Sequence, residues 1–151
     1  MSAAIDVVRT SVFSALNGAR AGNRDVAIIF LHGASADMAA TMRSASAARR
    51  DGVTLLAVGV TANVRVRELD AIASYPMMSN VFRIPNYFSF VNIQGGLTTA
   101  VCNGLFWRDY SRLVCLRNAM LTRVNIGVAR IFAAGVHCIL ASTPDDLFCA
   151  H

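Results

Sequence analysis

The sequence contains no lysine, and only 15% of its 151 residues are charged. All 14 basic residues are therefore arginines, and Arg49 and Arg50 are the only adjacent pair. A net charge of +5 without a basic run does not predict a nucleic-acid partner. The low charge and the 55% hydrophobic share exclude a disordered chain, and 3 prolines and 10 glycines exclude a collagen-like one. The composition predicts a single globular domain with a sizeable core.

Targeting and membrane signals are also scarce. Residues 1–22 do not resemble a signal peptide, because Asp6 and Arg9 interrupt the apolar stretch and no basic leader precedes it. The longest apolar stretch, residues 124–141, contains an asparagine, an arginine and a histidine, so a membrane span is not favoured. The sequence also lacks an Asn-x-Ser/Thr sequon. We expect the N-terminus to be folded structure.

The four cysteines do not form a known chemical motif. Their spacings of 13, 23 and 11 residues fit neither a zinc site nor a Cys-x-x-Cys redox pair. We expect mostly buried thiols at Cys102, Cys115, Cys138 and Cys149.

Helical and strand patterns alternate along the first two thirds of the chain. Largely apolar runs predict strands buried on both faces at residues 26–31 and 53–60, and residues 80–84, just before Pro85, predict a third strand. Helical spacing predicts a first helix that Ser2 can cap, and further helices that start at Asp37, Arg65 and about Asn86, the last one kinked or ended early by Gly95-Gly96. This order predicts an α/β fold: a partial doubly wound, mostly parallel sheet of about three strands with flanking helices.

The helical spacing also predicts which side chains face the core. In the first helix these are Ile5, Val8, Val12 and Leu16, and in the third they are Val66, Leu69 and Ile72, with Glu68 in a solvated first turn. Two further groups are expected to fill the core rather than to form binding surfaces: Met38, Met42, Met77 and Met78, and Phe82, Tyr87, Phe88 and Phe90.

These patterns coincide with a family resemblance. The resemblance rests on these segments, in chain order: Val12-Phe13, residues 17–20, 25–33 and 47–60, Glu68-Leu69, residues 71–74 and Val81-Phe82. In this order and spacing they resemble the later half of a von Willebrand factor type A (vWA) domain, closest to the extracellular-matrix versions in matrilins and non-fibrillar collagens. The resemblance covers about residues 3–104. It implies a domain over residues 1–104 that lacks its first strands, followed by an unassigned tail.

The resemblance implies a protein-binding module rather than an enzyme. Intact members hold a divalent cation, usually magnesium, in a metal-dependent adhesion site (MIDAS) at the carboxyl edge of the sheet. Hard oxygen ligands from an Asp-x-Ser-x-Ser loop, a threonine and a Thr-Asp-Gly turn suit that ion. This sequence has no Asp-x-Ser-x-Ser, and it has Leu31-His32-Gly33 at the turn. We therefore expect no cofactor and a lost metal site. The implied partner is a protein, such as a matrix protein or collagen, and the implied location is extracellular.

Three polar residues follow the first strand, at the edge where open α/β sheets bind ligands: His32, Ser35 and Asp37. We expect them to lie in a turn, with Asp37 near a helix start, and to offer a partner contact. Two other functions stay open. In the first, the chain is a non-functional fragment of a longer vWA protein. In the second, the chain is a small hydrolase-like enzyme that uses His32, Ser35 and Asp37, although the sequence lacks a Gly-x-Ser-x-Gly elbow.

The tail, residues 105–151, departs from the family pattern. Residues 107–120 predict a helix, and residues 128–141 predict either a helix or a strand pair. Cys102 is either free or paired with one of the other three cysteines. Without the family's first strand, the strand at residues 26–31 becomes an edge, and we expect self-association through it unless the tail or a partner covers it.

Overall fold

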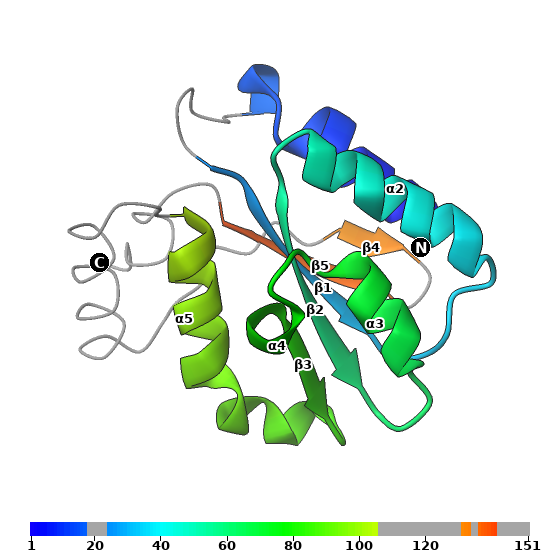
Figure 1. Ribbon diagram of the computed structural model, residues 1–151, viewed down its shortest axis with the longest axis vertical. Helices are drawn as coiled ribbons and strands as arrows, with labels where there is room; N and C mark the ends of the chain where they lie inside the picture. The colour runs from blue at the N-terminus through cyan, green and yellow to red at the C-terminus, as the bar shows by residue number, and fades with distance from the viewer. Residues whose placement is uncertain (18–23, 106–130, 134–135, 142–151) are drawn as a thin grey trace.

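The structure, a computed structural model, describes the backbone of residues 1–17, 24–105, 131–133 and 136–141, and the side chains of residues 1–17 and 24–104. The helices are α1 (Ser2–Val7), the π-helical η1 (Val8–Val12), the 3-10 turn η2 (Ala15–Asn17), α2 (Met38–Arg50), α3 (Val66–Ile72), α4 (Met77–Asn80), the 3-10 helix η3 (Tyr87–Asn92) and α5 (Gln94–Leu105). The strands are β1 (Val26–Leu31), β2 (Thr54–Val60), β3 (Val81–Ile84), β4 (Ile131–Ala133) and β5 (Val136–Ala141) (Figure 1).

The strands form one sheet in the order β3-β2-β1-β5-β4. β1, β2 and β3 run parallel, as expected for strands joined by helical crossovers. The three predicted strands lie within one residue of the observed ones, and the predicted α/β fold with a three-stranded parallel core is confirmed.

The first strand is not an edge, which corrects one expectation. β5 pairs antiparallel with all six residues of β1, from Val26 opposite Ala141 to Leu31 opposite Val136, and β4 pairs with β5. Of the two alternatives for residues 128–141, the strand pair is therefore the right one. The tail covers β1, so an exposed β1 no longer supports self-association. The helix predicted at residues 107–120 lies outside the described residues.

Both faces of the sheet are covered by helices, so the strands are apolar throughout. On β1, Ala27, Ile29 and Leu31 face α1, α2 and α3, whereas Val26, Ile28 and Phe30 face α5 and η3. Figure 1 shows these two helical layers on opposite sides of the strands. Such strands are typical of a doubly wound sheet.

The N-terminal helix differs from its predicted form. Its N-cap is Met1, without a side-chain cap, so Ser2 does not cap it. Ile5 and Val8 are buried, but the backbone widens to a π-helix after Val7 and Leu16 is 98% exposed. The π-helix ends at Val12, and Leu16 lies in the separate 3-10 turn η2, so it does not continue the apolar face of the helix.

α2 begins and ends as its sequence suggests. The Asp37 carboxylate caps it, because Oδ1 accepts a hydrogen bond from the Ala40 N–H at 2.9 Å. It ends at Arg50, and Gly52, two residues later, has φ +93°, a conformation that favours glycine. The prediction of Met42 as a core residue is wrong. The buried face instead carries Thr41, Ser44, Ala45 and Ala48, small side chains that let the helix pack closely.

α3 lies close to the sheet, but in a different rotation from the one predicted. A Cβ atom on Gly59 of β2 would lie 2.8 Å from Cδ1 of Leu69, so the close approach needs a glycine there. Leu69 and Ile72 are buried as expected, whereas Val66 is exposed and Glu68 is buried. The prediction of Glu68 as a solvated side chain is wrong.

The last helical region is divided into two helices. η3 ends at Asn92, and α5 starts at Gln94, so Gly95-Gly96 lie in the first turn of α5 instead of breaking a longer helix. Phe90 packs on Phe30 with ring centroids 6.0 Å apart. Phe88 was expected in the core but is 95% exposed.

Most of the methionines expected in the core are exposed as well. Met77, the first residue of α4, is exposed, and Met78 is 99% exposed. Both lie on the surface because α4 is a single short turn. A four-residue helix has too few positions to form an apolar face, so its methionines are not held against the sheet.

Cys102 in α5 is fully buried and is disulfide-bonded. The expectation of a thiol is therefore wrong for Cys102, and its partner lies among the residues whose side chains are not described. Within the described ranges, the structure has no helix that is both long and apolar enough to span a membrane.

Candidate functional site

The carboxyl ends of the three parallel strands are joined through Thr61, which directly follows β2. The Thr61 hydroxyl donates a hydrogen bond to the His32 carbonyl at 3.2 Å, and its N–H donates to the Ile84 carbonyl at 2.9 Å. Thr61 has φ +81°, which is unfavourable for a β-branched residue. Its two hydrogen bonds to neighbouring strands hold it there. One continuous edge therefore runs from His32 through Thr61 to the start of η3.

The loop after β1 is anchored by a buried carboxylate. Both oxygens of Glu68 accept from the Ser35 N–H, at 3.1 and 3.2 Å, and Glu68 is only 1% exposed. Sequence reasoning missed this role. A signal was present, because Glu68 lies four residues before Ile72 and so shares its side of the helix. Glu68 therefore holds the loop after β1 in place through the Ser35 N–H.

The three residues predicted for this site are neighbours in the loop but are not joined to one another. His32 is exposed, and the Asp37 carboxylate caps α2. The Ser35 hydroxyl oxygen is buried and makes no hydrogen bond to any described residue. A hydrolytic triad needs a nucleophile bonded to its base, and this arrangement lacks that bond. His32 and Asp37 are both exposed at the surface.

The described donors at this edge do not fit a divalent cation of the magnesium type. The part of the chain that the structure describes holds no group of three His, Cys, Asp or Glu side chains able to share a metal ion. The two nearest carboxylates, Asp37 and Glu68, already accept backbone N–H groups. A hard cation requires several oxygen ligands around one point, and these residues do not supply them.

Exposed apolar side chains continue the same edge beyond β3. η3 begins just after the carboxyl end of β3 and carries Tyr87, Phe88 and Val91, all exposed. We call these three residues together the η3 apolar patch. Aromatic side chains that contact water rather than the core are typical of binding surfaces.

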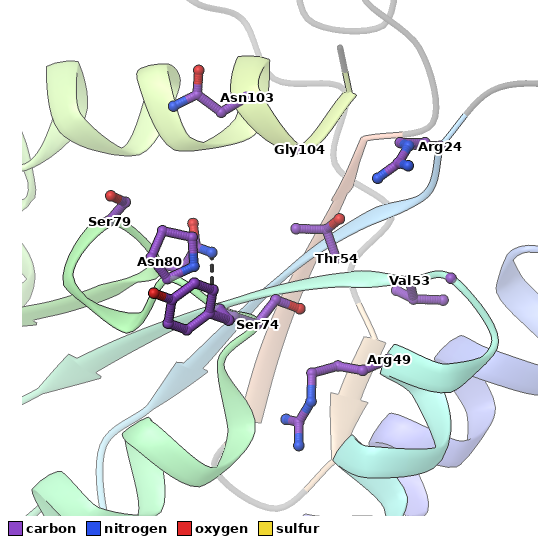
Figure 2. A pocket seen from close by; sticks show the side chains of 12 residues that line it. Arg24, Arg49, Val53, Thr54, Ser74, Ser79, Asn80, Asn103 and Gly104 are labelled. Atoms are coloured by element: carbon purple, nitrogen blue, oxygen red, sulfur yellow. Dashed lines mark hydrogen bonds between the residues drawn. The ribbon is translucent and has the colours of Figure 1, made fainter. Parts of the chain in front are cut away.

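A cavity of about 340 Å³ lies at the opposite, amino edge of the sheet. It is bordered by Arg24 before β1, the junction of α2 and β2, the segment from Ser74 to Asn80, and the end of α5 (Figure 2). Sequence reasoning did not identify it, because its walls come from four separate segments. Arg49 helps to close it, and its Nη1 donates to the carbonyls of Ala71, Ile72 and Ala73 at 2.8, 2.7 and 3.3 Å. Burial lowers the pKa of the Arg49 guanidinium.

The parallel strands β1, β2 and β3, with helices on both faces, define a doubly wound α/β domain, a class that binds ligands at the carboxyl edge of such strands. A model of the von Willebrand factor type A domain matches residues 1–96. The chain therefore belongs to the von Willebrand factor type A family. This family generally provides protein-binding or matrix-binding modules.

Solved structures share the fold. Proximal thread matrix protein 1 from the mussel byssus is 22% identical, with a TM-score of 0.54 over 59% of this chain. The same mussel protein with a zinc-occupied MIDAS motif is 21% identical, with a TM-score of 0.60 over 65% of this chain. The chain spans 22% and 24% of the length of these two structures.

Proposed function

We propose that this chain is a protein-binding module that engages an extracellular-matrix partner through the carboxyl edge of its sheet, without a divalent metal. The observation that carries the proposal is the η3 apolar patch, exposed at the same edge as His32 and Asp37. Membership of a family of binding modules supports it, and so does the likeness to a protein named as a matrix protein.

The chemistry of this edge suits a protein surface. Phe88 offers a large apolar group that a partner pocket can desolvate, and such aromatic anchors provide much of the free energy of binding in protein interfaces. His32 and Asp37 add polar contacts around it, while Thr61 and Glu68 keep their loop in place. A rigid edge loses little conformational entropy when it binds.

The disulfide at Cys102 supports an extracellular location. Disulfides form and persist in oxidising compartments and are rare in the cytosol of most organisms.

The direct test is binding to immobilised matrix proteins, collagen among them, by surface plasmon resonance. Phe88→Ala is expected to weaken binding by about tenfold or more, because a buried aromatic anchor contributes at least 1–2 kcal/mol. His32→Ala is expected to weaken it about threefold, as for a rim contact. Met78→Ala is the matched control, since Met78 is equally exposed but lies on α4 at the amino edge.

Two outcomes contradict the proposal. Equal loss of binding in Met78→Ala would place the contact elsewhere, and no binding to any matrix protein would favour a fragment without binding activity.

Magnesium is not expected to stabilise the domain. Magnesium and a chelator are expected to give the same melting temperature, within about 1 °C, because the described carboxylates at the edge are occupied by backbone N–H groups. A specific site at 100 times its Kd would add about 2.7 kcal/mol and raise the melting temperature by roughly 5–10 °C. Scanning calorimetry in both buffers, with calorimetric titration of magnesium, decides between these outcomes. A shift of that size would show that the edge does hold a cation.

A further inference from the structure

The outer side of β3 is a free strand edge. β3 lies at the end of the sheet, with β2 as its only neighbour among the described strands (Figure 1). The Ile84 carbonyl accepts a hydrogen bond from the Thr61 N–H, so the backbone groups of Ile84 face β2. Because successive residues of a strand direct these groups to opposite sides, those of Arg83 face outward. The Arg83 N–H and C=O form no hydrogen bond with a described residue.

This edge is short and limited at both ends. β3 has only four residues, α4 directly precedes it, and Pro85, which has no N–H, follows it. Short edges with a charged residue and a proline resist open-ended pairing between sheets. The free N–H and C=O of Arg83 nevertheless suit a short extended segment of another chain, which can add to a sheet as a strand.

The segments around this edge carry accessible positive charge. Three exposed arginines lie there: Arg65 and Arg67 at the start of α3, and Arg83 on β3. None of the three forms an ion pair with a described residue. Of the nearby carboxylates, Glu68 is buried, Asp37 caps α2, and Asp70 is half-buried. The accessible charge is therefore mainly cationic, which favours an acidic partner and disfavours a basic one.

The Arg83 side chain lies on the same face of the sheet as α3. Arg83 is in register with Gly59 of β2, and Leu69 of α3 packs directly over Gly59. Residues in register on neighbouring strands direct their side chains to the same face. A carboxylate opposite Arg83 on an added strand would form a cross-strand ion pair, close to the arginines of α3.

The η3 apolar patch lies just beyond the end of this edge. Tyr87 follows Arg83 by four residues, so their Cα atoms are at most about 14 Å apart. A segment that pairs with Arg83 can therefore also reach the exposed ring of Phe88. A sulfated polysaccharide carries negative charge but no apolar side chain, so the combination of arginines and an apolar patch favours a protein segment.

We propose that the partner of the carboxyl edge is an acidic, extended segment of a protein that adds to β3 as a strand. The inference rests on the proposed binding function and names the chemistry of its partner. The backbone of the segment bonds the Arg83 N–H and C=O, its carboxylates lie against Arg83 and the start of α3, and an apolar side chain covers Phe88.

The experiment is an NMR titration of the isotope-labelled full chain with a synthetic ten-residue peptide in which glutamate alternates with valine and phenylalanine stands at one end. We expect a Kd of about 1 mM or tighter, with shifts of the Arg83 and Phe88 amides. Hydrogen exchange of the Arg83 amide should slow in the complex, because that N–H gains an acceptor. The same peptide with glutamine in place of glutamate is expected to bind at least about tenfold more weakly.

Three results of this titration would overturn the proposal. Equal binding of the glutamine peptide would remove the role of charge, and an Arg83 amide without added protection would remove the strand addition. Tighter binding of a heparin oligosaccharide at the same amides would make a polysaccharide the ligand instead of a protein.

Variants separate this edge from general charge. Arg83→Gln is expected to weaken binding of the acidic peptide about tenfold, the loss of one charge-assisted contact. Arg50→Gln is the matched control, because Arg50 is exposed and carries the same charge but lies at the end of α2, at the amino edge. Equal effects of the two substitutions would contradict the proposal.

The matrix-binding assay keeps this proposal separate from the proposed function. Weaker binding of both Phe88→Ala and Arg83→Gln supports both. Loss of binding in Phe88→Ala with unchanged binding in Arg83→Gln leaves the binding function in place and overturns the acidic partner. Unchanged binding of both variants overturns both.

Discussion

A chain that ends at residue 105 is expected to lose most of its stability and to aggregate. Its β1 would keep β2 on one side but would lose β5, which pairs with all six of its residues. About half of the β1 backbone N–H and C=O groups face each neighbour, so several bonds worth about 1 kcal/mol each would be lost. A loss of the order of 5 kcal/mol is comparable to the whole stability of a small domain.

Aggregation follows from the character of β1 as well as from its lost bonds. All of its side chains are buried and apolar, and an exposed strand of that kind is a template for pairing with another chain. Light scattering after size exclusion is expected to show a monomer for the full chain and large species for the shortened one.

The same truncation removes the possible partners of Cys102, so a second variant is needed. Cys102→Ser in the full chain removes the disulfide but keeps β4 and β5. It is expected to stay monomeric with a lower melting temperature. If the chain ending at residue 105 were a monomer as stable as the full chain, the role assigned to β5 would be wrong.

The parallel half of the fold was predictable because its signal is local. β1 and β2 are short, largely apolar runs. A run of this kind is typical of a strand that is buried on both faces of a parallel sheet. β4 and β5 were ambiguous, since an apolar stretch without clear alternation fits a helix as well as a strand pair. Their place beside β1 depends on pairing over more than 100 residues, which local periodicity does not contain.

The faces of the helices were harder to predict than the helices themselves. In α3, Val66 and Glu68 exchange their expected positions, because the helix turns its Glu68 side toward the loop after β1. The gain is a partner for the Ser35 N–H, a tertiary contact that hydrophobicity alone does not reveal. In η3, Phe88 is aromatic but exposed, which is evidence for a binding surface rather than for a core.

The candidate site was predictable in position but not in its supports. His32, Ser35 and Asp37 follow a buried parallel strand, and this places them at the carboxyl edge. Thr61 and Glu68 come from other segments and act through hydrogen bonds to the backbone; the spacing of Glu68 to Ile72 indicates a buried side, but no pattern in the sequence reveals the backbone groups that either residue bonds.

Glu68→Ala is expected to destabilise the domain by about 3 kcal/mol, the sum of a buried N–H left without an acceptor and a small cavity. For a domain of this size the melting temperature should fall by roughly 6–12 °C. Removal of a buried charge acts in the opposite direction, because a desolvated carboxylate is costly. We expect the lost acceptor to decide the sign, since both Glu68 oxygens lie within 3.2 Å of the Ser35 nitrogen.

Glu68→Gln separates these two contributions, because it keeps the volume and one acceptor oxygen but removes the charge. It is expected to lie within about 1 kcal/mol of the wild type by chemical denaturation. Hydrogen exchange of the Ser35 amide gives a local measurement: protection should fall in Glu68→Ala and remain in Glu68→Gln. A loop released in this way should also weaken partner binding, because His32 would no longer be held at the edge. Equal destabilisation by both substitutions would mean that the charge of Glu68, rather than its hydrogen bond, holds the loop.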